Sequence, residues 1–254
     1  MELRRHDLLD IDDEGRRKIL DELTESESIR SFDAHRYARI LLPDQAECRV
    51  PGVVRREEQA PRNGLIPVGF SSPVADKEGR FRIAAFVHPH NVIGITSPYE
   101  VLASANLKPR NACTKALDIT KSHAQALNLF LGVWGSVALE LYTGLPCTHQ
   151  NSDLDLLVKP ASHEVLARFL TEITSIEKRF GMRIDVELDL PDGYGVQLKE
   201  LFGSRQTVLG KGTKEVALLV KEKVFAGLPQ KTQSLPLHVA VGNQEQLYGC
   251  RHSN

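Results

Sequence analysis

Hydrophobic positions in the second half of the chain change repeatedly between helical and strand spacing. Residues 163–180 place apolar side chains three and four positions apart, which predicts one long amphipathic helix. Apolar runs at 129–134 and 154–158 and a strictly alternating segment at 183–188 predict strands. The remaining predicted elements are two helices and two short strands, at 112–128, 137–142, 207–209 and 216–220. This order predicts an α/β domain on one mixed sheet.

The first half follows a different pattern. Residues 1–40 are predicted to be helical, because charged and apolar residues alternate at helical spacing between 13 and 23. Short apolar runs between about 49 and 95 predict a small β-rich unit. Ser97 and Glu100 are spaced as a capping box and predict a helix start. The predicted divisions are a small α+β N-terminal domain, a second domain and a tail without clear pattern: 1–110, 111–228 and 229–254.

Composition limits the classes of function. The 254 residues are 41% hydrophobic and 26% charged, enough for a core without staples. The net charge of −1 provides no overall field toward nucleic acid or an anionic membrane. No signal region or membrane-length apolar window is apparent, so a soluble cytoplasmic protein is expected, with no nucleic acid or membrane partner. The cysteines are widely spaced and indicate free thiols rather than a zinc site: Cys48, Cys113, Cys147 and Cys250.

Gly135-Ser136 is the first candidate for chemistry. It lies between a predicted strand and a predicted helix. Glycine allows the backbone to approach a ligand closely, and the amides at a helix start favour phosphate. The alternative is a plain turn with a serine cap.

Asp153 and Asp155 are the second candidate, because residues two apart on a strand point to the same face. Two carboxylates together on an otherwise apolar strand are costly unless a cation neutralises them. The alternative is that Asp153 caps the strand while Asp155 faces solvent.

Asp185 lies on the next predicted strand, after one long helix. Alternation places Asp185, Glu187 and Asp189 on one face of that strand. A solvent-exposed acidic face is the alternative. Together with the first pair, however, Asp185 completes three carboxylates on adjacent strands, a set that can hold the two Mg²⁺ ions of phosphoryl or nucleotidyl transfer.

The three pieces together resemble the polymerase-β-type nucleotidyltransferase superfamily. The intervening segment 140–149, joined to Gly135-Ser136 and to the segment 152–157, is similar to the phosphoribosyl-dephospho-CoA transferases of malonate decarboxylase, also called malonate decarboxylase holo-acyl-carrier-protein synthases. In the first half, Arg5-His6-Asp7-Leu8-Leu9 resembles the opening motif of that family. The resemblance extends over roughly residues 4–225 and implies a mixed-sheet nucleotidyltransferase domain after a small β-rich domain.

That resemblance implies a reaction and its residues. The donor would be a triphosphoribosyl-dephospho-CoA, and the acceptor a serine of the acyl carrier subunit of malonate decarboxylase, with diphosphate released. Asp153, Asp155 and Asp185 would be catalytic and would bind Mg²⁺. Gly135 and Ser136 would bind the triphosphate, and His149, in the family-like segment, is a further candidate for substrate binding or else a polar loop residue.

Other interpretations remain. Arg55, Arg56, Lys211 and Lys214 are candidates for phosphate or carrier contacts, and ordinary solvated side chains otherwise. The same site would also serve transfer of a simple nucleotide from an NTP to a protein or small molecule. A protein that kept the fold but lost catalysis is the alternative from another class.

Overall fold

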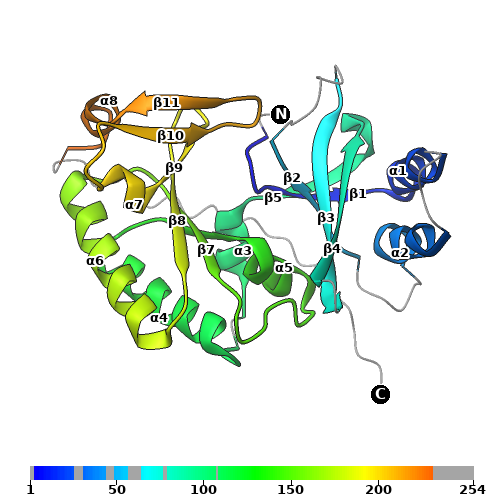
Figure 1. Ribbon diagram of the computed structural model, residues 1–254, viewed down its shortest axis with the longest axis horizontal. Coiled ribbons are helices and arrows are strands. Elements are labelled where there is room, and N and C mark those ends of the chain that lie inside the picture. Colours follow the sequence, from blue (N-terminus) through cyan, green and yellow to red (C-terminus); the bar gives the residue numbers. More distant parts are fainter. Residues whose placement is uncertain are drawn as a thin grey trace.

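The computed structural model has two sheets that lie side by side, each with its own helices (Figure 1). It describes residues 3–25, 31–43, 49–56, 64–76, 79–106 and 108–230. The predicted tail therefore lies outside the described residues from 231 onward, as do Cys48 and Cys250. In the portion of the chain described, no helix is both long and apolar enough to cross a membrane.

The N-terminal sheet has five antiparallel strands in the order β4-β3-β2-β1-β5. Helices α1 and α2 pack beside it (Figure 1). The bounds are β1 Leu8–Ile11, α1 Asp13–Glu25, α2 Ser31–Leu41, β2 Gly52–Val54, β3 Ile66–Asp76, β4 Gly79–Val87 and β5 Val92–Thr96, with a short 3-10 helix at Pro89–Asn91. The predicted β-rich unit is thus confirmed.

The prediction of helix throughout residues 1–40 is wrong at β1. This strand lies between β2 and β5, and both of its faces are buried. Leu9 and Ile11 belong to the N-terminal core, whereas Leu8 packs into the core of the second sheet. Four residues are too few for a periodic signal, and tertiary pairing decides their conformation.

Helix α3, Pro98–Ser104, connects the two units. It begins at the predicted capping box, in which Ser97 and Glu100 bond reciprocally. The helix packs on β6, where Gly132 leaves no room for a side chain: a Cβ there would lie 3.1 Å from Pro98 and Tyr99. The division predicted at residue 110 stays a prediction.

The second sheet is mixed and six-stranded, in the order β11-β10-β9-β8-β7-β6. Among the strands that the structure describes, only β7 and β8 pair in parallel, and the long helix α6 connects them. The bounds are α4 Ala112–Ala126, β6 Leu131–Trp134, α5 Gly135–Thr143, β7 Leu154–Val158, α6 His163–Phe180, β8 Ile184–Asp189, β9 Gly195–Gln197, α7 Leu198–Leu201, β10 Thr207–Lys211, β11 Val216–Val220 and α8 Lys221–Ala226. The predicted strands and helices of this half are confirmed, while β9, α7 and α8 were not predicted.

The apolar core explains why one face of this sheet is acidic. Helices α4 and α6 pack together on one side of the sheet (Figure 1). Phe169 and Ile173 of α6 are fully buried in the same core as Leu156 of β7 and Val186 of β8. Since strand side chains alternate, the carboxylates at the positions between these core residues point to the opposite face.

Candidate active site

The turn between β6 and α5 brings the backbone against a carboxylate. Trp134 is the N-cap of α5 and Gly135 its first residue, with φ +69°. A Cβ built on Gly135 would lie 2.3 Å from Oδ2 of Asp155. Both the left-handed φ and the close approach therefore require glycine here. The Gly135 backbone thus lies against the Asp-x-Asp strand, and phosphate binding by Gly135-Ser136 stays a prediction.

Replacing Gly135 with alanine is expected to lower the rate of the phosphoribosyl-dephospho-CoA transfer that the resemblance implies at least about 100-fold, because the added methyl group displaces Asp155. Gly144→Ala is the matched control: Gly144 has φ +73°, and a Cβ there would meet no atom within 4 Å. Gly144→Ala therefore has the backbone strain of a left-handed alanine, about 1–2 kcal/mol, without a steric clash. This variant is expected to keep its activity within about twofold of the wild type. Equal activities in a transfer assay, with both melting temperatures measured, would show that the close approach is unimportant.

The carboxylates of the two central strands meet at this turn. In the pairing of β7 with β8, Asp155 lies beside Asp185, and in the pairing of β6 with β7 it lies opposite Trp134. Asp153 directly precedes β7. The structure thus brings together Gly135, Asp155 and Asp185, while the more exposed Asp153 lies just before the strand. The alternative in which Asp155 simply faces solvent does not fit, because its carboxylate lies against the Gly135 backbone.

The site concentrates negative charge. Burial, followed by the charges of Asp185 and Asp153, raises the pKa of Asp155 to about 7. Arg183 offsets part of this charge: its Nη2 lies 2.7 Å from Asp185 Oδ2 and 3.3 Å from Asp153 Oδ2. With 64% of its side chain exposed, Arg183 makes pairs of only about 0–1 kcal/mol, so a divalent cation can displace it.

The donor set suits magnesium by its chemistry. Carboxylate oxygens are the ligands Mg²⁺ prefers, and the clustered acids need a cation. Within the described ranges, no three His, Cys, Asp or Glu side chains are already arranged around one metal position. Arg183 bridges two of the three carboxylates, so a cation held by all three would compete with its guanidinium.

Two family models together match nearly all of the described chain. The model for the N-terminal domain of phosphoribosyl-dephospho-CoA transferase MdcG matches residues 4–98, and the model for the C-terminal domain matches residues 100–222. The chain belongs to the phosphoribosyl-dephospho-CoA transferase MdcG family. The resemblance found in the sequence is thereby confirmed, and the chain is a transferase of this family.

Curated relatives support the match. The phosphoribosyl-dephospho-CoA transferase of Xanthomonas axonopodis pv. citri is 33% identical over 176 residues, which cover 69% of this chain and 81% of that protein. The enzyme of Bradyrhizobium diazoefficiens is 28% identical over 223 residues, covering 88% and 92%. That of Pseudomonas aeruginosa is 35% identical over 108 residues, covering 41% and 49%. No solved structure matches this chain.

In this family member, the acidic face continues beyond Asp185 into buried ion pairs. Glu187 is 1% exposed. Its Oε2 lies 3.2 Å from Arg5 Nη1 and 3.3 Å from His6 Nε2. Its other oxygen, Oε1, lies 3.8 Å from Lys211 Nζ. Burial alone would raise the pKa of Glu187, but the hydrogen bond with His6 and the charges of Arg5 and Lys211 lower it to about 2. Lys211 therefore pairs with Glu187 while 34% of its side chain stays exposed, and a phosphate contact of this lysine stays a prediction.

Asp189 has a similar set of partners. Arg4 Nη1 and Lys159 Nζ lie 2.8 Å and 2.5 Å from its carboxylate oxygens, and the Tyr99 hydroxyl donates to Oδ2 at 3.0 Å. The alternative of a solvent-exposed acidic face is wrong for Glu187 and Asp189, because segments distant in sequence cover them. Sequence reasoning noted the Arg5-His6-Asp7 motif but assigned it no place in the site.

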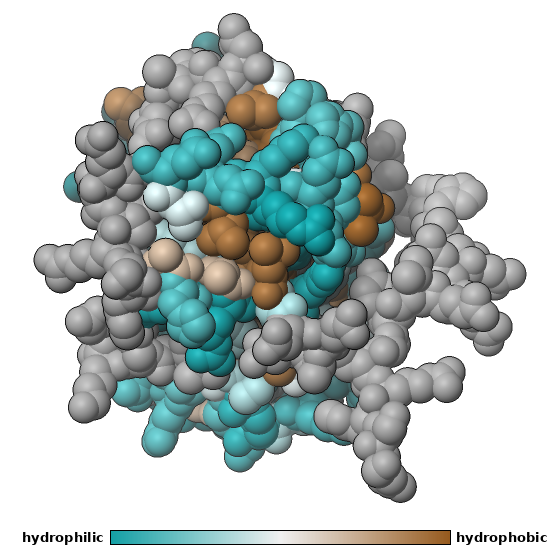
Figure 2. Space-filling model, turned by 90° about the vertical axis from the view of Figure 1, so that its right-hand side faces the viewer, coloured by the Kyte–Doolittle hydropathy of each residue, from teal (hydrophilic) through white to brown (hydrophobic). Residues whose placement is uncertain are grey.

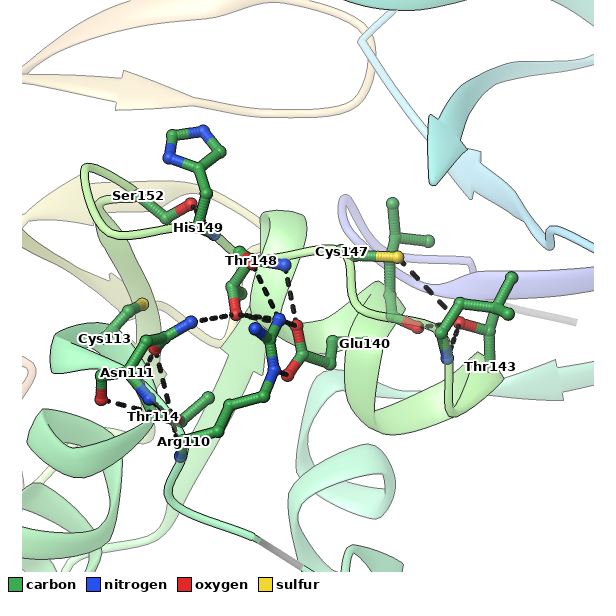
Figure 3. A network of polar contacts seen from close by, with 12 residues as sticks. Arg110, Asn111, Cys113, Thr114, Glu140, Thr143, Cys147, Thr148, His149 and Ser152 are labelled. Atoms are coloured by element: carbon green, nitrogen blue, oxygen red, sulfur yellow. Dashed lines mark hydrogen bonds and ion pairs between the residues drawn. The ribbon is translucent and has the colours of Figure 1, made fainter. Parts of the chain in front are cut away.

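A polar clamp holds the segment that leads into the Asp-x-Asp strand (Figure 3). Arg110 donates to both carboxylate oxygens of Glu140, at 2.8 Å and 2.6 Å, and to the Thr148 carbonyl at 2.6 Å. Glu140 in turn accepts from the Thr148 amide at 2.6 Å. Arg80 also donates to the Cys147 carbonyl. The residues just before Asp153 are therefore held to α5 and to the start of α4.

His149 follows this clamp, and its ring points away from the Arg110–Glu140 network (Figure 3). Its amide donates to Ser152 Oγ at 2.9 Å, and its Nδ1 accepts from the Asn151 amide at 3.2 Å. Because Nδ1 accepts this bond, Nε2 is the ring nitrogen that carries a proton and can donate to a ligand. This suits a phosphate contact, although substrate binding by His149 stays a prediction.

The remaining candidates lie outside this group of carboxylates. Arg55 and Arg56 follow β2 in the N-terminal sheet, and Lys214 is exposed in the turn between β10 and β11. Contacts of these residues with phosphate or a carrier stay predictions. Cys113 and Cys147 are free and buried thiols. Burial raises the pKa of both, which leaves them unreactive at neutral pH.

Proposed function

We propose that this protein transfers phosphoribosyl-dephospho-CoA from 2′-(5-triphosphoribosyl)-3′-dephospho-CoA to a serine of the acyl carrier subunit of malonate decarboxylase. Membership of the transferase family supports the substrate and the partner. One observation about the site carries the chemistry: the Gly135 backbone lies against Asp155, which lies beside Asp185. The proposed phosphate-binding turn therefore lies next to the two carboxylates that are proposed to bind a cation.

Asp153, Asp155 and Asp185 are the residues that would hold Mg²⁺. When bound, the metal neutralises the charge on the attacking and leaving oxygens. The finer fold assignment, a polymerase-β-type nucleotidyltransferase domain on the mixed sheet, is part of this proposal. The turn at the end of β6, the Asp-x-Asp strand and the third carboxylate on the neighbouring strand support it.

Backbone amides and side chains of the protein carry out the remaining steps. The amides at Gly135 and Ser136 hold the departing diphosphate at the start of α5, where the helix dipole favours negative charge. The serine oxygen of the carrier forms a bond to the α-phosphorus as the bond to diphosphate breaks. Its proton passes to a carboxylate of the site, for which Asp185 is the candidate, and then to solvent. His149 offers its Nε2 proton to a phosphate oxygen.

The test is the intact mass of the purified apo carrier subunit after incubation with this protein, Mg²⁺ and triphosphoribosyl-dephospho-CoA. A mass gain equal to phosphoribosyl-dephospho-CoA, absent with EDTA, is the expected result. ATP is run in parallel as a donor. A gain equal to AMP would retain the site but reject the substrate, and no gain with either donor would favour a protein that binds without catalysis.

A further inference from the structure

The N-terminal segment reaches the candidate phosphate-binding turn from the other sheet. The His6 ring stacks on the Trp134 indole, with ring centroids 4.0 Å apart and planes inclined by 23°. Trp134 immediately precedes Gly135-Ser136 and is the N-cap of α5. Its Nε1 donates to the Leu156 carbonyl at 3.2 Å. One face of the indole is thus covered by His6, while its edge is tied to β7.

The backbone at His6 is held in a conformation that costs energy. Its φ is +74°, in the left-handed region that residues other than glycine adopt uncommonly, histidine, asparagine and aspartate being the ones found there most often. Neighbouring bonds enforce this turn: the His6 amide donates to the Val54 carbonyl at 3.0 Å, and the Arg4 amide donates to Asp7 Oδ2 at 2.8 Å. Such strain persists where surrounding structure requires a particular side-chain direction.

A ring nitrogen of His6 is held by a carboxylate of the acidic strand. His6 Nε2 lies 3.3 Å from Glu187 Oε2, and Arg5 Nη1 reaches the same oxygen at 3.2 Å. Glu187 occupies the strand that carries Asp185, two residues further along. The ring of His6 therefore links the two parts of the site, the turn after β6 and the acidic strand β8.

The face seen from the side of the N-terminal unit is largely hydrophilic, with some apolar side chains among the described residues (Figure 2). His6 itself is only 9% exposed and points inward toward Trp134. Because its ring is buried, His6 offers little surface to a ligand. Its role is inferred from its two ring contacts, the stack on Trp134 and the bond to Glu187.

We propose that His6 is a positioning residue that holds Trp134, and through it the Gly135-Ser136 backbone, in the geometry that binds the triphosphate of the donor. The inference rests on the proposed function of that turn. The stacked ring prevents the indole from turning, and the indole sets the direction in which the chain enters α5. Loss of the ring is expected to weaken triphosphate binding about tenfold, because the amides lose their preset orientation.

Fluorescence provides the test, because Trp134 is the chain's single tryptophan. The full-length protein with Mg²⁺ is titrated with inorganic triphosphate and, separately, with triphosphoribosyl-dephospho-CoA. His6→Asn tolerates the left-handed backbone but loses the stack; we expect a shifted Trp134 emission and an about tenfold higher Kd for both probes. His6→Phe keeps an aromatic ring at the stacking position without the bond to Glu187. Because the left-handed backbone strains this variant, its melting temperature is measured alongside; where it folds, we expect binding within about threefold of the wild type. His123→Asn, at a half-exposed histidine of α4, is the matched control.

The outcomes separate the two proposals. Wild-type emission and binding in a folded His6→Asn variant would overturn the positioning role, as would equal loss of binding in His6→Phe. If His6→Asn fails to fold, His6→Phe alone decides, since weakened binding with intact structure contradicts a role for stacking. Binding of inorganic triphosphate but not of the CoA derivative would reject the proposed function. The role of His6 would then be decided by the triphosphate affinities of the variants and the wild type.

Discussion

Asp155→Asn is expected to abolish transfer to the carrier, by about 10³-fold or more, without unfolding the protein. The carboxylate lies beside Asp185 and against the Gly135 backbone, so it is the central member of the proposed cation site. A loss of that size equals about 4 kcal/mol of transition-state stabilisation, the scale expected of a metal ligand. Transfer measured by carrier mass against time, at saturating donor, gives the rate.

Thermal melting separates this loss from misfolding. The variant removes a buried charge that lies near Asp153 and Asp185, so its melting temperature without metal should equal or exceed that of the wild type. Mg²⁺ should raise the melting temperature of the wild type but not of Asp155→Asn. Asp118→Asn, on the exposed side of α4, is the control and should behave as the wild type. An active Asp155→Asn variant would reject the metal site.

Arg16→Met is expected to destabilise the N-terminal unit by about 3–5 kcal/mol. Arg16 is 1% exposed, and its guanidinium donates to three backbone carbonyls. Those carbonyls belong to Ile11, Leu41 and Val50, at 2.9 Å, 3.2 Å and 2.8 Å. Burial lowers the pKa of Arg16 only to about 10, so the side chain stays charged at neutral pH. Methionine fills most of the volume but leaves all three carbonyls without this donor.

Urea unfolding followed by circular dichroism measures the difference in the free energy of unfolding. Arg17→Met is the matched control, because the neighbouring Arg17 has 64% of its side chain exposed and only a 3.9 Å pair with Asp13. That control should change stability by less than about 0.5 kcal/mol. If the two variants unfold at the same urea concentration, the bonds from Arg16 to the carbonyls contribute nothing to the fold.

Local patterns determined most of the second half. Helix α6 and strands β7 and β8 appear where spacing predicted them, because each has a buried face that repeats with the period of its element. The capping box at Ser97 was equally readable, since its two partners are three residues apart. The grouping of Gly135, Asp155 and Asp185 followed from the order of strands and from the family resemblance, although their roles stay predictions.

Only the tertiary structure decided which other groups join that site. Nothing in the sequence near Glu187 indicates that its carboxylate pairs with Arg5 and bonds to His6, some 180 positions earlier. β1 was missed for the same reason, since its four residues become a strand through pairing with β2 and β5. Spacing along the chain determines which face a side chain takes within an element. The partner across that face is chosen by the packing of whole units, which brings distant segments together to bury apolar surface and pair buried charge.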